Sequence, residues 1–240
     1  MALVRCLLIF ILVLPFASAR AMEARDDIDP WESMNRRIFA FNETLDKYLL
    51  RPVAKGYRFV MPNPLERGVS NFIANIYEFN TVYNSLLQGR PADAFDSTGR
   101  FIINTTFGLV GLFDVATAIG IEHRPADFGQ TLSVWGVEQG PFIMAPLIGP
   151  RTARSGVGYL VDTYTSIPAI IDDTEWAYLF WTVEVIDIRA QLIKADELIS
   201  GDRYIFIRNA YLQRRDAFLN GGKVEDTFSD YADEEDYEEF

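Results

Sequence analysis

The chain has 240 residues, of which 49% are hydrophobic, 14% aromatic and 23% charged. This length suffices for one or two domains with a sizeable core, and the charged fraction exceeds that expected of a polytopic membrane protein. The net charge of −12 gives no electrostatic reason to bind nucleic acid. The composition suits a protein that rests in or on a membrane.

Residues 1–21 have the pattern of a secretory signal peptide. Arg5 supplies a positive start, residues 7–14 form a short apolar segment, and small residues recur in A-x-A patterns over 17–21. A transmembrane anchor is the alternative, but the apolar segment is shorter than a bilayer span. The sequence therefore predicts export with cleavage.

Cleavage would remove Cys6, the only cysteine of the chain. A lipoprotein signal needs its cysteine at the end of the apolar segment, whereas Cys6 stands before it. We therefore expect an unacylated mature chain without disulfides, beginning with a polar linker at 22–28.

The first predicted helix begins at Asp29, which suits an N-cap, with Pro30 in its first turn and Glu32 third. Apolar residues then recur at spacings of three and four, which places them on one face. We expect that face to contact the membrane, with core packing as the alternative. Arg51-Pro52 is expected to break the helix. The candidate membrane-contact residues are Trp31, Met34, Ile38, Phe41 and Leu45.

Three further helices are predicted at 53–60, 65–87 and 92–106, because proline- and glycine-containing turns separate them. The segment 101–121 is the most apolar one after the signal peptide, but its Asn, Thr, Gly and Asp residues argue against a lipid-exposed span. We expect a helix break at 108–111 instead.

Residues 132–147 predict a short hairpin, because the glycine-flanked segment 136–141 separates two apolar arms. The arms are either strands or helices. Later helices are expected at 157–164, 173–198 and 204–219, followed by Gly221-Gly222 as a C-cap. The fold class is thus a single all-α domain of amphipathic helices over 29–222. The acidic tail at 223–240 is expected to be disordered.

Catalytic patterns are scarce in this sequence. His123 is the single histidine, and its place in a turn favours a surface residue. No G-x-S-x-G elbow or Walker A loop is present, and one histidine without a mature cysteine excludes the usual zinc sites. We expect no enzyme activity, no metal and no cofactor. A periplasmic hydrolase with an acidic site and a structural protein that scaffolds porins remain as alternatives.

Several sequence motifs together resemble the VacJ/MlaA family of outer-membrane lipoproteins. Their span, from about Asp29 to Gly222, covers nearly all of the expected mature body. The motif blocks are Asp29-Pro30-Trp31-Glu32, Asn35-Arg36, Phe41-Asn42, Asn71-Phe72, Asn75, residues 84–89, Arg100-Phe101, Asn104-Thr105-Thr106, residues 108–114, 127–132, 135–137, 140–142 and 146–150, Asp202-Arg203-Tyr204, Arg208 and residues 211–214.

The resemblance implies a ring of helices embedded in the periplasmic leaflet of the outer membrane, with an amphipathic channel and a trimeric porin beside it. It implies removal of misplaced phospholipids from the outer leaflet and their transfer to a soluble periplasmic carrier. This sequence departs from the family in its missing lipobox cysteine and in Arg154-Ser155, where an Arg-Asp pair is expected.

A ring-shaped lipid conduit needs a wall with apolar and polar character. We expect the apolar segment 107–113 to form part of that wall and the glycine-flanked segment 136–141 to gate it, with a static turn as the alternative. The candidate channel and gate residues are Phe107, Leu109, Val110, Leu112, Phe113, Trp135, Gly136, Gly140 and Phe142.

Overall fold

Helices make up most of the chain over residues 28–171 and 174–220, which the computed structural model describes. The only strands in these ranges form one short antiparallel pair. In chain order the elements are α2 (Glu32–Leu45), a π-helical segment (Asp46–Leu50), α3 (Arg51–Val60), α4 (Asn63–Leu87), α5 (Pro91–Thr106), α6 (Val115–Ala118), α7 (Phe128–Val134), β1 (Phe142–Ala145), β2 (Gly149–Thr152), α8 (Ala153–Thr165), α9 (Ile167–Ile170), α10 (Thr174–Leu192), a 3-10 helix (Ala195–Leu198) and α11 (Arg203–Leu219).

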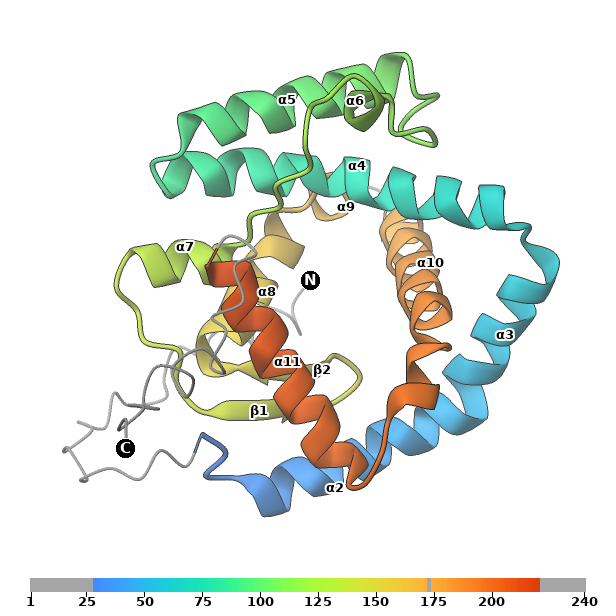
Figure 1. The fold of residues 1–240 in the computed structure, drawn as a ribbon, viewed down its shortest axis with the longest axis vertical. Helices are drawn as coiled ribbons and strands as arrows, with labels where there is room; N and C mark the ends of the chain where they lie inside the picture. The colour runs from blue at the N-terminus through green and yellow to red at the C-terminus, as the bar shows by residue number, and fades with distance from the viewer. Residues whose placement is uncertain (1–27, 172–173, 221–240) are drawn as a thin grey trace, which may run out of the picture.

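These elements are arranged as a ring (Figure 1). The α4–α5 pair closes its upper side, α3 and α10 lie at the right, and α2 runs along the bottom. On the left, α7, α8 and the β1–β2 hairpin complete it, and α11 runs across the front from its start near α2 to its end near α7. This arrangement confirms the predicted helical fold class.

Most helix ends fall where local sequence predicts them. Pro62 has extended backbone angles between α3 and α4, and Gly89 has a φ of 71° after α4. The α5 helix stops at Thr106, before Leu109 (φ 51°) and Val110 (φ 61°) in left-handed conformation. That region is strongly disfavoured for a β-branched residue. The expected break at 108–111 is confirmed, and no described helix is both long and apolar enough to cross a bilayer.

The predicted break at Arg51-Pro52 is wrong. The chain stays helical from α2 through the π-helical segment into α3, with right-handed helical angles at Leu45, Leu50 and Arg51. Pro52 stands at the start of α3, where its missing N–H costs least. The π-helical segment absorbs the change in helical register, so the chain bends around the ring without a loop.

Asp29 does not cap α2. Trp31 occupies the N-cap position without a side-chain cap hydrogen bond. The Asp29 carboxylate is buried and instead accepts hydrogen bonds from Asn35, from Tyr204 on α11 and from Arg208 on α11. A tertiary network therefore takes the place of the predicted local cap.

Asn35 links α2 to the hairpin. It is fully buried, its Nδ2 donates to the Phe142 carbonyl at 3.1 Å, and its Oδ1 accepts from the Met144 N–H at 2.9 Å. The small apolar cluster of Phe142, Met144 and Tyr204 lies beside these bonds. The contact of α2, β1 and α11 thus combines a satisfied polar network with apolar packing.

The hairpin lies further along the chain than expected. The first predicted arm is the end of α7, and the paired strands are β1 and β2, in register from Phe142↔Thr152 to Ala145↔Gly149. Leu147 at the turn has a φ of 65°. Asn42 of α2 holds this turn through bonds to Ala145 and Leu147.

Two more polar clusters join the upper helices. Arg100 of α5 pairs with Glu78 of α4 at 2.6 Å and with Asp114 before α6 at 3.1 Å. Asp162 of α8 accepts hydrogen bonds from Tyr83 and Asn84 of α4. Because these side chains bond partners on other elements, they fix how the helices meet.

Candidate functional site

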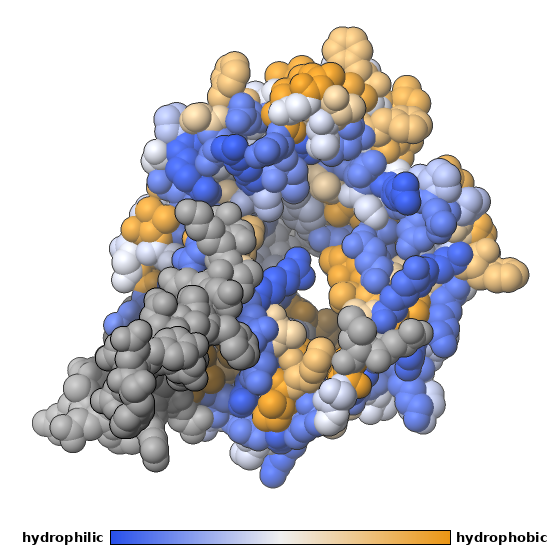
Figure 2. Space-filling model, in the orientation of Figure 1, coloured by the Kyte–Doolittle hydropathy of each residue, from blue (hydrophilic) through white to orange (hydrophobic). Residues whose placement is uncertain are grey.

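An opening passes through the body near its centre in the space-filling view (Figure 2). Apolar surface borders it next to α10 and below, and polar surface borders it on the left (Figures 1 and 2). The rim of the opening therefore combines both kinds of surface.

The α10 helix is apolar well beyond the face that it buries. Ala177 and Phe180 are buried, and Phe180 meets Phe72 and Tyr77 of α4. Its exposed apolar residues are Tyr178, Leu179, Val185, Ile188 and Leu192. A helix in water normally turns polar residues outwards, so α10 is suited to apolar surroundings on its exposed sides.

An apolar cavity of about 200 Å³ lies between α2, the hairpin, α10 and α11. Phe39, Met144, Leu192 and Ile207 supply much of its apolar lining. A larger hollow of about 480 Å³ adjoins it, and the charged residues in its lining come from α2, the π-helical segment, α3 and α11. Glu43, Asp46 and Arg203 line both spaces.

Ion pairs hold the boundary between the two spaces. Arg189 of α10 pairs with Asp46 at 2.5 Å and with Asp196 at 2.7 Å. Arg203 of α11 pairs with Glu43 and with Asp196. These bonds raise the pKa of the Arg189 guanidinium, and the hydrogen bond that it donates to Asp46 is the main cause. Both cations stay charged beside an apolar cavity, an arrangement that can hold an amphiphile.

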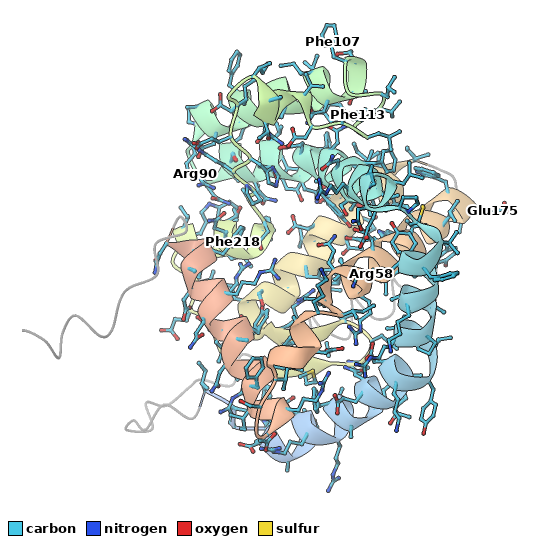
Figure 3. The ribbon with its side chains drawn as sticks, turned by 45° about the vertical axis from the view of Figure 1, so that its right-hand side comes forward. Arg58, Arg90, Phe107, Phe113, Glu175 and Phe218 are labelled. Carbon is cyan, nitrogen blue, oxygen red and sulfur yellow. The ribbon has the colours of Figure 1, made fainter. Side chains whose placement is uncertain are left out.

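The structure places the segment 107–113 away from the opening, so the expectation that it lines the channel wall is wrong. Phe107 points out from the top of the molecule in Figure 3, at the end of the α5–α6 layer. The exposed residues of this segment are Phe107, Leu109, Val110, Leu112 and Phe113. They form an apolar surface on the outer edge, because the break after α5 turns the chain outwards.

The predicted gate residues separate into two groups. Phe142 is fully buried and packs against Tyr204 and Tyr211, so it is a core residue and its assignment to the gate is wrong. Trp135 is exposed, and its Nε1 donates to the Leu87 carbonyl at 3.1 Å.

Gly136 (φ 84°) and Gly140 (φ 66°) both have left-handed angles that favour glycine. A Cβ at Gly140 would lie 2.9 Å from the Ala153 side chain. Gating by 136–141 stays a prediction.

The α2 stripe is largely open to the surroundings. Trp31, Met34 and Phe41 are exposed, with Phe41 at 51%, whereas Ile38 and Leu45 are half-buried. The side of α2 that packs inwards carries Asn35 and Asn42 instead. Membrane contact by the stripe stays a prediction.

His123 has one charged neighbour, Glu78, whose carboxylate lies 3.0 Å from its Nδ1 and also accepts from Arg100. No cluster within 28–171 and 174–220 has the side chains to hold a metal ion. Burial acts to raise the pKa of Asp114, but hydrogen bonds from Thr117, Arg100 and Asn104 outweigh it and lower the pKa to about 2. The cluster is therefore a structural ion-pair network with a histidine at its edge.

Sequence reasoning did not identify Phe39, Arg189, Leu192, Arg203 and Ile207 as site residues. Only Arg203 lies within a quoted motif, the Asp202-Arg203-Tyr204 block. The others come from segments that meet only after the ring has closed, so no local pattern marks them.

The fold and the site define a helical ring with an amphipathic interior. The family model described as MlaA lipoprotein matches residues 27–218, and the chain belongs to this family.

Two relatives have the same name, "Intermembrane phospholipid transport system lipoprotein MlaA". The Escherichia coli (strain K12) protein is 37% identical over 204 residues, which cover 82% of this chain and 80% of that protein. The Haemophilus influenzae protein is 34% identical over 203 residues, covering 82% and 81%. A solved structure titled "Structural basis for maintenance of bacterial outer membrane lipid asymmetry" aligns with a TM-score of 0.71 at 38% identity, covering 80% of this chain and 99% of that one.

Proposed function

We propose that this protein takes part in intermembrane phospholipid transport, removing mislocalised phospholipids from the outer leaflet of the outer membrane. The observation that carries the proposal is an apolar cavity beside a hollow with charged lining residues, in a protein whose helices form a ring. A phospholipid has a charged head and apolar tails, so such a pair of spaces complements it. The names of the relatives support the same function.

The protein acts at the periplasmic side of the outer membrane of a Gram-negative bacterium. The exposed apolar residues of α2, α3 and the 107–113 segment support insertion of the ring's outer surface into one leaflet, because soluble proteins rarely expose so many. A trimeric porin beside the ring and a soluble periplasmic carrier as acceptor are parts of the proposal.

Mass spectrometry of lipid bound to the detergent-purified protein tests this function. Wild-type protein should retain phospholipid, and Leu192→Gln, which places an amide in the apolar cavity, should retain much less. Leu65→Gln is the matched control, since Leu65 is exposed at the start of α4 and lines neither space. If the purified protein carries no lipid and hydrolyses a chromogenic ester, the alternative function of a periplasmic hydrolase is favoured instead.

A further inference from the structure

Arg154, in the first turn of α8, is a buried arginine that has no carboxylate partner within residues 28–171 and 174–220. Three arginines are buried among residues 28–171 and 174–220. Arg100 pairs with Glu78, and Arg215 pairs with Asp127. Arg154 is 8% exposed, and its guanidinium makes a single hydrogen bond to a described residue, from Nη1 to the Val137 carbonyl at 2.8 Å.

The other edge of the Arg154 guanidinium is free. Its Nε is buried and has no acceptor among the described residues. A guanidinium presents Nε and one terminal nitrogen as a fork that matches two oxygens of a phosphate or carboxylate. Other arginines also have a buried Nε without an acceptor, among them Arg215, but Arg215 is paired with a carboxylate, whereas the buried Arg154 has only the Val137 carbonyl among the described residues.

The charges around Arg154 do not neutralise it. Burial lowers the arginine pKa first, and the positive charge of Arg215 lowers it further. Asp127 and Asp216 act in the opposite direction, but the Asp127 carboxylate is already engaged by both terminal nitrogens of Arg215. A buried charge without a partner costs free energy, and an anion would remove that cost.

The residue after Arg154 adds no negative charge. Ser155 closes the N-terminus of α8 through reciprocal hydrogen bonds with Thr152, and its hydroxyl also meets the Tyr211 hydroxyl at 2.6 Å. The residue next to Arg154 is thus neutral, and its hydroxyl is already hydrogen-bonded to Thr152 and Tyr211.

Apolar surface adjoins the same arginine. Two backbone carbonyls of the neighbouring segment accept hydrogen bonds from Arg154. The Val137 carbonyl accepts from the guanidinium, and the Gln139 carbonyl accepts from the backbone N–H. Val134, Trp135 and Val137 are exposed along this segment. A cation is therefore bonded to the end of an apolar lip, which we define as residues 134–137.

We propose that Arg154 binds the phosphate of a phospholipid whose acyl chains lie along the 134–137 lip. This inference rests on the proposed function and adds a headgroup site to it. The phosphate oxygens accept from the free Nε edge, and the apolar lip keeps water away from the pair. A charge-assisted bond in such a place is stronger than one in water.

The test compares two lipids with the same acyl chains, phosphatidylglycerol and diacylglycerol, offered to the full chain in the same detergent. Wild-type protein should prefer phosphatidylglycerol, and Arg154→Gln should lose that preference by about tenfold or more. Arg154→Lys keeps the charge without the fork and should keep a weaker preference. Arg124→Gln is the control, since Arg124 is exposed and its guanidinium already pairs with Asp93 and Glu122.

Thermal unfolding separates this role from a structural one. Removing an uncompensated buried charge should leave the melting temperature of Arg154→Gln unchanged or raise it, whereas a structural arginine would lower it. Unchanged lipid preference in Arg154→Gln overturns the headgroup site. Inorganic phosphate that stabilises wild-type protein but not Arg154→Gln against thermal unfolding, while both proteins show the same lipid preference, shows a free-anion site and also overturns the headgroup site. Wild-type protein that retains neither lipid contradicts the proposed function itself.

Discussion

Replacing Asn35 by alanine should weaken the joint between α2, the hairpin and α11. Asn35 is 0% exposed, and its amide makes three contacts, with Asp29 at 2.7 Å, the Phe142 carbonyl at 3.1 Å and the Met144 N–H at 2.9 Å. In the alanine variant these three groups lose the Asn35 amide as a hydrogen-bond partner, and water does not reach the site to replace it.

The expected loss follows from the number of groups affected. A buried polar group left unsatisfied costs about 1–3 kcal/mol. The Met144 N–H loses its acceptor, while Asp29 keeps its bonds from Tyr204 and Arg208. We therefore expect a decrease of about 3 kcal/mol in the free energy of unfolding. For a domain of this size that lowers the melting temperature by roughly 6–12 °C.

Thermal unfolding in detergent, followed by circular dichroism, measures this change. Asn71→Ala is the matched control, because Asn71 makes one partly exposed bond, to the Leu112 carbonyl at 3.2 Å. It should lower the free energy of unfolding by about 1 kcal/mol or less. Equal melting temperatures for the two variants would refute the reasoning that the buried network holds the ring together.

Three further predictions concern the surface and the upper cluster. Phe41→Asp should move the protein from membrane to soluble fractions. Asn209→Asp, at an exposed position of α11, is the control and should not. If the Phe41 variant unfolds, the α2 stripe belongs to the core. Because the folded pKa of Asp114 is about 2, below its ordinary 3.8, its contribution to stability is present above about pH 4 and disappears as the pH falls towards 2. The difference in melting temperature between wild type and Asp114→Asn should therefore shrink between pH 5 and pH 3. His123→Ala should leave lipid transport unchanged in a cell-envelope assay, since its one charged neighbour, Glu78, keeps its pairing with Arg100.

Local sequence predicts the helix ends well because their causes are local. The positive φ of Gly89 and the extended backbone at Pro62 act within a turn of each helix end. The helical spacing likewise identified the exposed stripe on α2.

Predictions that depended on distant partners were wrong. Asp29 has an ideal sequence context for a cap, yet Tyr204 and Arg208 of α11 engage its carboxylate. The composition of 107–113 suits a channel wall as well as an outer surface, and only the path of the chain around the ring decides between them. The cavity residues Phe39, Leu192 and Ile207 come from three separate helices, so no spacing rule brings them together.

The bond between Tyr204 and Asp29 joins residues 175 positions apart. Contacts of such long sequence separation form slowly, because a long loop must close before they contribute. Closure of the ring therefore waits for the segment 203–219, which leaves the ribosome after all the other described helices. If the chain crosses the inner membrane from its N-terminus, the earlier helices must stay as an open arc with their apolar sides uncovered. A holding chaperone in the receiving compartment would bind the apolar sides of that arc, and it would be released when α11 closes the ring.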